Sequence, residues 1–178
     1  EAMMRRAEDE KEPRLRNMAQ QLHSFTRHGI YRKYFDGPNS LDYKNNLVVL
    51  ELDHLKGKKH LQQVVLLQLI AQLNNEFYLG DRRVPKILLV DEAWEAFEDP
   101  MVAKFLEGAF RRMRKAAAAP VVVTQSLRDL YNSASGEAIA NNAANVIVLR
   151  QNGEAIEALK ESGRFNIGDY GYEMLKSL

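Results

Sequence analysis

Cysteine is absent from this 178-residue sequence, which excludes disulfides, thiolate zinc sites and cysteine nucleophiles. No apolar run is long enough for a membrane span, because the longest apolar helix candidate, residues 61–73, is interrupted by glutamines. The formal charge of +1 gives no general attraction to nucleic acid or acidic membranes. What is present, 46% hydrophobic and 28% charged residues, is typical of one globular domain with a substantial core.

A phosphate-binding loop of the form G-x-x-x-x-G-K-[ST] is also absent. In the single Gly-Lys pair, Gly57 has no glycine five residues before it, and Lys59 replaces the required Ser or Thr. Such a loop supplies the backbone N–H groups and the lysine that hold the β- and γ-phosphates. Two interpretations remain at this point: an α/β module that is not an ATPase, or part of an ATPase cut after its first strand.

Two adjacent acids follow a short apolar run. Residues 87–90, I-L-L-V, predict a strand that is buried on both faces, as in a parallel sheet. Asp91 and Glu92 follow at its carboxyl end, where open α/β sheets bind ligands. In P-loop ATPases the first acid helps hold Mg²⁺, and its neighbour positions or deprotonates the attacking water. Alternatively, Asp91 caps the next helix and Glu92 lies in its first turn.

The order of apolar patterns predicts alternating strands and helices. We expect a helix over residues 1–26, interrupted near Pro13, and a turn-rich segment over residues 28–46. The predicted strands are residues 47–52, 87–90, 120–124 and 146–149. The predicted helices are residues 58–78, 100–117, 136–144 and 169–178. Helix-length connections between the strands predict right-handed crossovers and a parallel sheet.

Other polar residues with candidate roles stand at the ends of these elements. Gln125 follows strand 120–124, so it either hydrogen-bonds a γ-phosphate or attacking water, or ends the strand and caps a helix over residues 127–131. The apolar stripe of helix 100–117 predicts packing on the sheet. The arginines at its end either lie on a solvated face or include an arginine finger for a neighbouring subunit. Trp94 is most simply a packing residue at the rim of the site.

The motifs, in this order, resemble the C-terminal half of the TraC family of conjugative-transfer ATPases of F-type type IV secretion systems. More broadly, they are similar to VirB-type secretion ATPases in the FtsK/HerA branch of RecA-like motors. The resemblance covers most of the chain and is carried by F-T-R-H-G-I-Y-R-K-Y-F-D-G (25–37), L-V-V-L-E-L-D-H-L (47–55), I-L-L-V-D-E-A-W (87–94), F-R-R-M-R-K (110–115), V-V-V-T-Q-S-L-R-D-L-Y (121–131) and I-A-N-N-A-A-N-V-I-V-L-R-Q (139–151).

This resemblance implies an α/β fold with a RecA-like P-loop NTPase core, in which helices flank a mostly parallel sheet. Residues 1–46 would be a helical and turn-rich lead-in, and residues 47–178 the C-terminal part of the ATPase domain. Residues 87–92 would form a Walker B motif, in which Asp91 assists Mg²⁺ through water and Glu92 is the catalytic base. Gln125 would sense the γ-phosphate. Arg114 would be the first choice for an arginine acting in trans, ahead of Arg111, Arg112 and Arg150.

The resemblance also implies partners and a location. The intact protein would use ATP and Mg²⁺ and would form a homo-oligomeric ring, such as a hexamer. It would lie in the cytoplasm at the inner membrane of a Gram-negative bacterium, beside other type IV secretion components. The alternatives are a HerA/FtsK-like DNA-translocating ATPase and a non-catalytic assembly scaffold. The near-neutral charge gives no indication of DNA contact.

The sequence departs from the family pattern in two places, the missing phosphate loop and the run of four alanines, and the first of these predicts an incomplete sheet. The phosphate loop and its strand would precede Glu1, so we expect this part alone to be inactive and the sheet to have a gap between residues 121–123 and 146–149. Another chain would fill the gap, or that half of the sheet would rearrange. Direct pairing of residues 121–123 with 146–148 would contradict the gap. Residues 116–119, four alanines, stand where such proteins often have a glycine-containing turn.

Overall fold

The computed structural model describes residue 6, residues 12–38 and residues 45–177, and the chain splits into units Glu1–Gln63 and Val64–Leu178. The predictions for residues 1–5, 7–11 and 39–44 lie outside the described residues. This division does not test the predicted start of the ATPase domain at residue 47, which stays a prediction.

The described part of the first unit includes helices α2 and α3 and an aromatic cluster, followed by a 3₁₀ turn, Asp53–Leu55. Helix α2, Pro13–His23, begins at the predicted break with Pro13 in its first turn, where a missing N–H costs nothing. Helix α3, Arg32–Phe35, follows, and the ring of Phe25 packs against the rings of Tyr31 and Phe35.

The predicted strand at residues 47–52 is wrong. This segment has no regular secondary structure, and the side chains of Leu47 and Val49 are each 80% exposed. An extended segment becomes a strand only when a second strand satisfies its backbone groups. No described residue supplies that second strand here.

Helix α4, Lys59–Asn74, continues into a π-helical turn, Asn75–Leu79, which confirms the long helix predicted at residues 58–78. Within the described ranges, no helix has the combined length and apolarity that a bilayer span requires.

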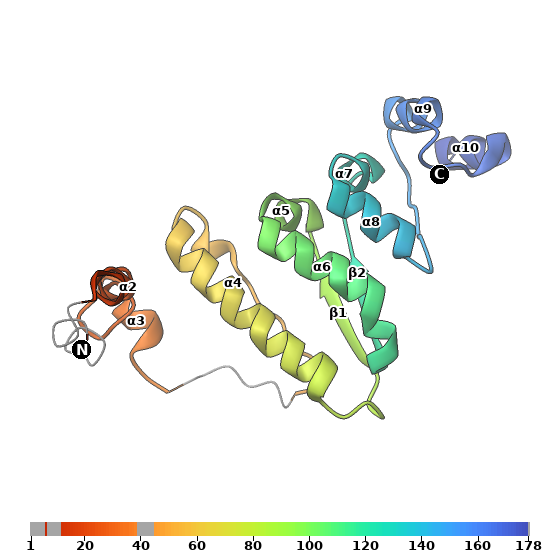
Figure 1. Cartoon of the computed structure of the whole chain (residues 1–178). Helices are drawn as coiled ribbons and strands as arrows, with labels where there is room; N and C mark the ends of the chain where they lie inside the picture. The colour runs from red at the N-terminus through yellow and green to blue at the C-terminus, as the bar shows by residue number, and fades with distance from the viewer. Residues whose placement is uncertain (1–5, 7–11, 39–44, 178) are drawn as a thin grey trace. The chain divides into compact units, whose positions relative to one another are not determined.

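The sheet consists of β1, Lys86–Val90, and β2, Ala118–Val122, which run parallel as predicted (Figure 1). Strand β2 begins two residues earlier than predicted, and Pro120 pairs in register with Leu88. Because the backbone N–H of Val123 donates to Val90, the alternation of the ladder turns the nitrogen of Pro120 away from β1. A proline is tolerated at that edge, since no donor is needed there.

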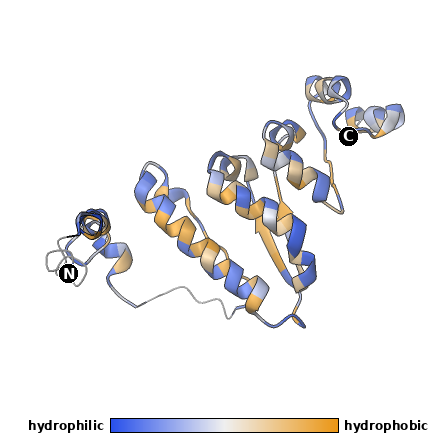
Figure 2. Cartoon of the chain, viewed as in Figure 1, coloured by the Kyte–Doolittle hydropathy of each residue, from blue (hydrophilic) through white to orange (hydrophobic). Residues whose placement is uncertain are grey.

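The sheet has one covered and one exposed face, so the prediction that residues 87–90 are buried on both faces is wrong. Leu88 packs with Ala109, Met113 and Ala118. On the opposite face, Ile87 is 70% and Leu89 is 60% exposed. Figure 2 shows that β1 is hydrophobic over most of its length. Among the described residues, no second layer covers the outer face, which explains why apolar residues stay exposed there.

The predicted fourth strand at residues 146–149 is also wrong. The sheet formed by the described residues has two strands instead of four. The segment does not pair with residues 121–123, and Ile147 is 87% exposed. Val148 instead packs against the cluster formed by Ile156, Tyr172 and Leu175. The free edge of β2 has no strand partner among the described residues, and what fills the predicted gap stays a prediction.

Helices flank one face of the sheet, in agreement with the predicted fold class (Figure 1). Helix α5 is Ala93–Glu98 and helix α6 is Pro100–Arg112, which continues as a 3₁₀ turn, Met113–Ala116. Ala117 then adopts a left-handed backbone with φ of 53°, where glycine would be relaxed. The local backbone therefore turns here, with alanine in the strained position.

The remaining helices follow β2. Helix α7 is Leu127–Tyr131 and α8 is Ala134–Asn142, close to their predicted positions. Helices α9, Gly153–Ser162, and α10, Gly168–Ser177, pack together around Ile156 and Tyr172. Helix α9 was not predicted, whereas α10 confirms the expected terminal helix.

Helix α6 begins with a side-chain cap that gives a direct test of local stability. Asp99 Oδ1 accepts hydrogen bonds from the backbone N–H groups of Met101 and Val102, at 2.9 and 3.2 Å. Asp99→Ala is therefore expected to lower the free energy of unfolding by about 1 kcal/mol, and Asp99→Asn by much less, because asparagine is an equally good N-cap. Urea unfolding of both variants measures the difference. Equal losses would contradict the capping role.

Candidate functional site

The two strands bring their carboxyl ends together, and the pairing continues beyond β1 and β2. The backbone N–H of Val123 donates to the carbonyl of Val90, and the N–H of Ala93 donates to the carbonyl of Val123, both at 2.9 Å. Asp91 and Glu92 therefore lie beside the end of β2. This continued ladder places Gln125, two residues after Val123, within reach of the acids.

Glu92 and Gln125, 33 positions apart in the sequence, contact each other directly. Gln125 Nε2 donates to Glu92 Oε1 at 2.8 Å, and Trp94 Nε1 donates to Glu92 Oε2 at 2.7 Å. Hydrogen bonds to an ionised carboxylate are stronger than those between neutral groups. The side chains that the sequence placed at one edge of the sheet are thus joined in the structure.

Glu92 has an unusual backbone conformation. Its φ is 49° and its ψ is 44°, in the left-handed region that residues other than glycine rarely occupy. It is the N-cap residue of α5, yet its side chain makes no capping hydrogen bond to the backbone N–H groups of that helix. Such strained positions cluster at functional sites, where the surrounding structure maintains them. Here the carboxylate turns to Trp94 and Gln125 instead of capping.

Gln125 is held in place by a capping box on the next helix. Ser126 Oγ accepts from the backbone N–H of Arg128, and Asp129 Oδ2 accepts from the N–H of Ser126 and from Thr124 Oγ1. These bonds fix the residues on both sides of Gln125. The residue that caps helix α7 is therefore Ser126, so the alternative in which Gln125 caps it is wrong.

Asp91 lies at the exposed end of β1. Its Oδ1 accepts the backbone N–H of Glu92 at 2.9 Å. The side chain makes no hydrogen bond to the N–H groups of α5 in the structure, whose N-cap residue is Glu92, so the capping alternative for Asp91 is also wrong.

Arg114 lies at the opposite end of the sheet from the acids. The backbone N–H of Lys86 donates to the carbonyl of Ala117, so the turn that carries Arg114 stands where β1 begins. A five-residue strand is about 17 Å long, which separates Arg114 from Glu92 within one chain. The Arg114 side chain is exposed and has no hydrogen bond or ion pair within the described part of the chain.

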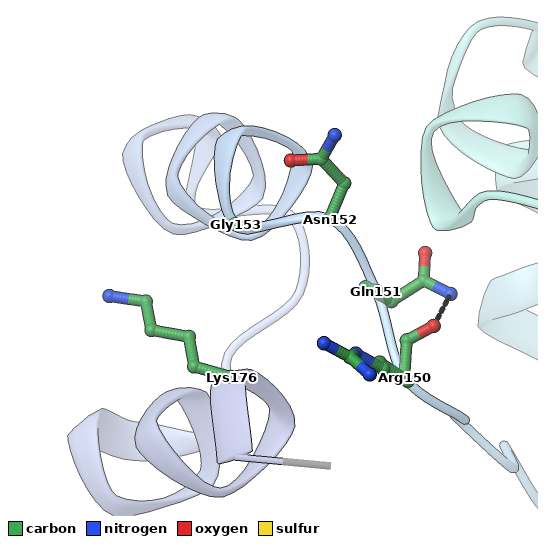
Figure 3. A pocket seen from close by; sticks show the side chains of 5 residues that line it. All are labelled: Arg150, Gln151, Asn152, Gly153 and Lys176. Atoms are coloured by element: carbon green, nitrogen blue, oxygen red, sulfur yellow. Dashed lines mark hydrogen bonds between the residues drawn. The ribbon is translucent and has the colours of Figure 1, made fainter.

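The other candidate arginines are placed differently. Arg111 is paired with Glu107 at 2.8 Å, and Arg112 lies over the ring of Tyr78. Arg150 lines an open pocket with Gln151, Asn152, Gly153 and Lys176 (Figure 3). None of these residues is brought to Glu92 or Gln125.

Several of the polar groups that line the pocket in Figure 3 already have partners within the chain. Lys176 is paired with Glu157, and this contact lowers the pKa of the Glu157 carboxyl. The side chain of Asn152 accepts the backbone N–H of Glu154 and so caps α9. Gln151 donates to the carbonyl of Arg150. The Lys176–Glu157 pair therefore joins α10 to α9, and Asn152 stabilises the start of α9.

Similarity to known proteins establishes the family. The family model described as the TraG P-loop domain matches residues 1–159. The chain belongs to the TraG P-loop domain family.

Two individual proteins resemble this TraG P-loop domain. Protein TraC of Escherichia coli (strain K12) is 30% identical over 159 residues, which are 86% of this chain and 18% of TraC. The structure of VirB4 of Thermoanaerobacter pseudethanolicus matches with a TM-score of 0.62 and 21% identity, covering 98% of this chain and 47% of that chain. These similarities confirm the predicted resemblance to TraC and VirB-type proteins and the P-loop NTPase fold class. The chain spans less than a fifth of TraC and about half of that VirB4 chain.

The donor set of this TraG P-loop domain suits Mg²⁺ held jointly with phosphates. Among the described residues, no group of three or more His, Cys, Asp or Glu side chains could form a metal cage. Mg²⁺ in phosphoryl-transfer enzymes is usually held by one or two carboxylates and the phosphates of the substrate, with several waters retained. The exposed carboxylate of Asp91 fits that arrangement.

Sequence reasoning missed the part that Trp94 plays at this site. The sequence predicts a packing residue at this position, but the indole N–H of Trp94 contacts the Glu92 carboxylate. The available signal is the spacing D-E-A-W, which places an N–H donor two residues after the second acid. That spacing becomes informative only with the left-handed backbone of Glu92, which no sequence pattern indicates.

Proposed function

We propose that the protein containing this chain hydrolyses ATP with Mg²⁺ and uses the energy to assemble, or to drive transfer through, a conjugative type IV secretion channel. The observation that carries the proposal is the contact between Glu92 and Gln125 at the carboxyl ends of two parallel strands. P-loop ATPases place their water-activating and phosphate-sensing groups at this edge. Membership of the TraG P-loop domain family supports the same activity.

Each residue has a proposed role. Asp91 helps hold Mg²⁺ through water, and the ion neutralises negative charge on the phosphates when it is bound. Glu92 accepts a proton from the attacking water, with its carboxylate oriented by neighbouring N–H donors. Gln125 changes partner from Glu92 to a γ-phosphate oxygen or the attacking water, because a neutral amide can donate to either.

The proposed site is completed outside this chain. The sequence contains no G-x-x-x-x-G-K-[ST] loop, so we propose that another part of the longer protein supplies it and that the 178-residue chain alone does not hydrolyse ATP. Arg114 is exposed and far from Glu92 of its own chain, which favours a role at the site of a neighbouring subunit. We therefore propose a homo-oligomeric ring, such as a hexamer, peripheral to the inner membrane and in contact with other secretion components.

Steady-state ATP hydrolysis by the full-length protein tests this proposal. We expect hydrolysis that requires Mg²⁺ and falls by about 10²- to 10³-fold in kcat for Gln125→Ala, since one positioned polar contact in the transition state is lost. Gln151→Ala is the matched control, because Gln151 bonds only within the loop before α9 among the described residues. Absence of Mg²⁺-dependent hydrolysis in a full-length protein that still supports conjugation would instead indicate an assembly scaffold.

A further inference from the structure

Trp94 is an aromatic residue whose position is not explained by core packing. It is the one tryptophan in the 178 residues, and 38% of its surface is exposed. It lies in the first turn of α5, next to Ala93, which is fully buried. A buried or half-buried indole N–H normally finds an acceptor, and here the acceptor is the Glu92 carboxylate at 2.7 Å.

The bonds that Trp94 and Gln125 make to the carboxylate of Glu92 come from different parts of the structure. Trp94 is two residues away on the same helical turn, so its bond to Oε2 depends only on local backbone geometry. Gln125 belongs to the loop after β2, and its bond to Oε1 joins the ends of two strands. The Trp94 bond is therefore the one that can persist when a ligand approaches the edge of the sheet and engages Gln125.

The local backbone is consistent with a lasting Trp94 bond and an exchangeable Gln125 bond. Glu92 has three rotatable side-chain bonds and, with a left-handed backbone, makes no capping bond that would fix them. The Trp94 N–H fixes one oxygen of the carboxylate, and the other oxygen then points to the end of β2. A rigidly held indole is well suited to this, because the tryptophan side chain has only two rotatable bonds.

We infer that Trp94 is a positioning residue for Glu92, holding Oε2 so that Oε1 is directed toward the reacting water. This inference rests on the proposed function, in which Glu92 is the base. Trp94 touches neither nucleotide nor water in this scheme and acts through Glu92. When the site is engaged, Gln125 leaves Oε1 and the Trp94 bond stays.

The first test measures the bond without using activity. In full-length protein labelled with ¹⁵N-tryptophan, the indole N–H signal that is lost in Trp94→Phe or Trp94→Tyr belongs to Trp94. We expect this signal to shift in Glu92→Ala and to stay in place in Glu98→Ala, which removes an exposed carboxylate from the same helix. A Trp94 signal that does not respond to Glu92→Ala would overturn the inference.

The second test measures the effect on turnover. Trp94→Phe keeps the aromatic ring but removes the N–H, so we expect kcat for ATP hydrolysis to fall by about 10- to 100-fold, as for a misplaced catalytic group. KM for ATP is expected to stay within about twofold, because the ring does not contact the nucleotide. In a Glu92→Gln background, Trp94→Phe should have no further effect, since the two residues act as a unit.

The outcomes separate this inference from the proposed function. Unchanged kcat in Trp94→Phe, together with loss of turnover in Glu92→Gln, would overturn the positioning role and leave the proposed function in place. Unchanged turnover in Glu92→Gln would overturn the proposed role of Glu92, and the inference with it. A fall in kcat and an equal rise in KM for Trp94→Phe would indicate a packing role and would also overturn the inference.

Discussion

Glu92→Gln in the full-length protein is expected to lower kcat for ATP hydrolysis by about 10²- to 10⁴-fold, the usual contribution of a general base. The amide of glutamine has nearly the size of the carboxylate but accepts no proton from water at neutral pH. Binding of ATP should survive, because Glu92 contacts the protein through its side chain and is not proposed to hold the phosphates. Single-turnover hydrolysis and equilibrium binding of a fluorescent ATP analogue measure the two effects separately.

The control for this substitution is Glu98→Gln, which removes a negative charge from the same helix at an exposed position. Its kcat should match that of the unsubstituted protein. If Glu92→Gln and Glu98→Gln both retain full turnover, Glu92 has only a structural role at the start of α5. If Glu92→Gln loses ATP binding together with turnover, the carboxylate acts in organising the site rather than as a base.

The part of the site that could be predicted from the sequence depends on local information. An apolar run followed at once by two acids places those acids at the end of a strand, wherever that strand lies. A helix-length connection between two such runs makes the strands parallel, which brings their carboxyl ends to one edge. The meeting of Glu92 with Gln125 follows from these two rules.

The wrong predictions concern pairing, which local patterns do not determine. Residues 47–52 and 146–149 have the β-branched and aliphatic composition of strands, and this composition favours an extended backbone. A ladder also requires a partner at the correct distance, and the described residues offer none to either segment. Val148 instead packs on the α9–α10 cluster, where a small apolar core was available.

Backbone strain is the other feature that sequence patterns do not predict. Glu92 and Ala117 both have positive φ, although neither residue type favours it. The left-handed backbone of Ala117 lets the chain turn from the 3₁₀ segment into β2. The left-handed backbone of Glu92 directs its carboxylate to Trp94 and Gln125. Both positions are imposed by the elements on either side, so a single-residue propensity predicts the wrong conformation.

Arg114→Ala in the full-length protein is expected to lower kcat for ATP hydrolysis by about 10³- to 10⁵-fold, the usual contribution of an arginine that stabilises transition-state charge. The side chain is exposed and has no hydrogen bond or ion pair in the described part of the chain. It lies where β1 begins, whereas the acids follow the end of that strand, which is about 17 Å long. Full-length Arg114→Ala protein should bind ATP and form the same oligomer while losing hydrolysis. Arg111→Ala is the matched control, since Arg111 is already paired with Glu107 at 2.8 Å and should change kcat less than twofold.

Mixing two inactive variants decides whether Arg114 acts on a neighbouring subunit. In oligomers assembled from Arg114→Ala and Glu92→Gln subunits, some interfaces combine an intact Glu92 from one subunit with an intact Arg114 from the next. We expect hydrolysis to reappear in such mixtures, with a maximum near equal proportions, because each site needs one residue from each side. If Arg114 served the site of its own chain, every site in the mixture would lack one of the two groups and no activity would return. Recovery of ATP hydrolysis in the mixture of Arg114→Ala and Glu92→Gln subunits, together with normal activity of Arg111→Ala, would therefore place the catalytic site between subunits.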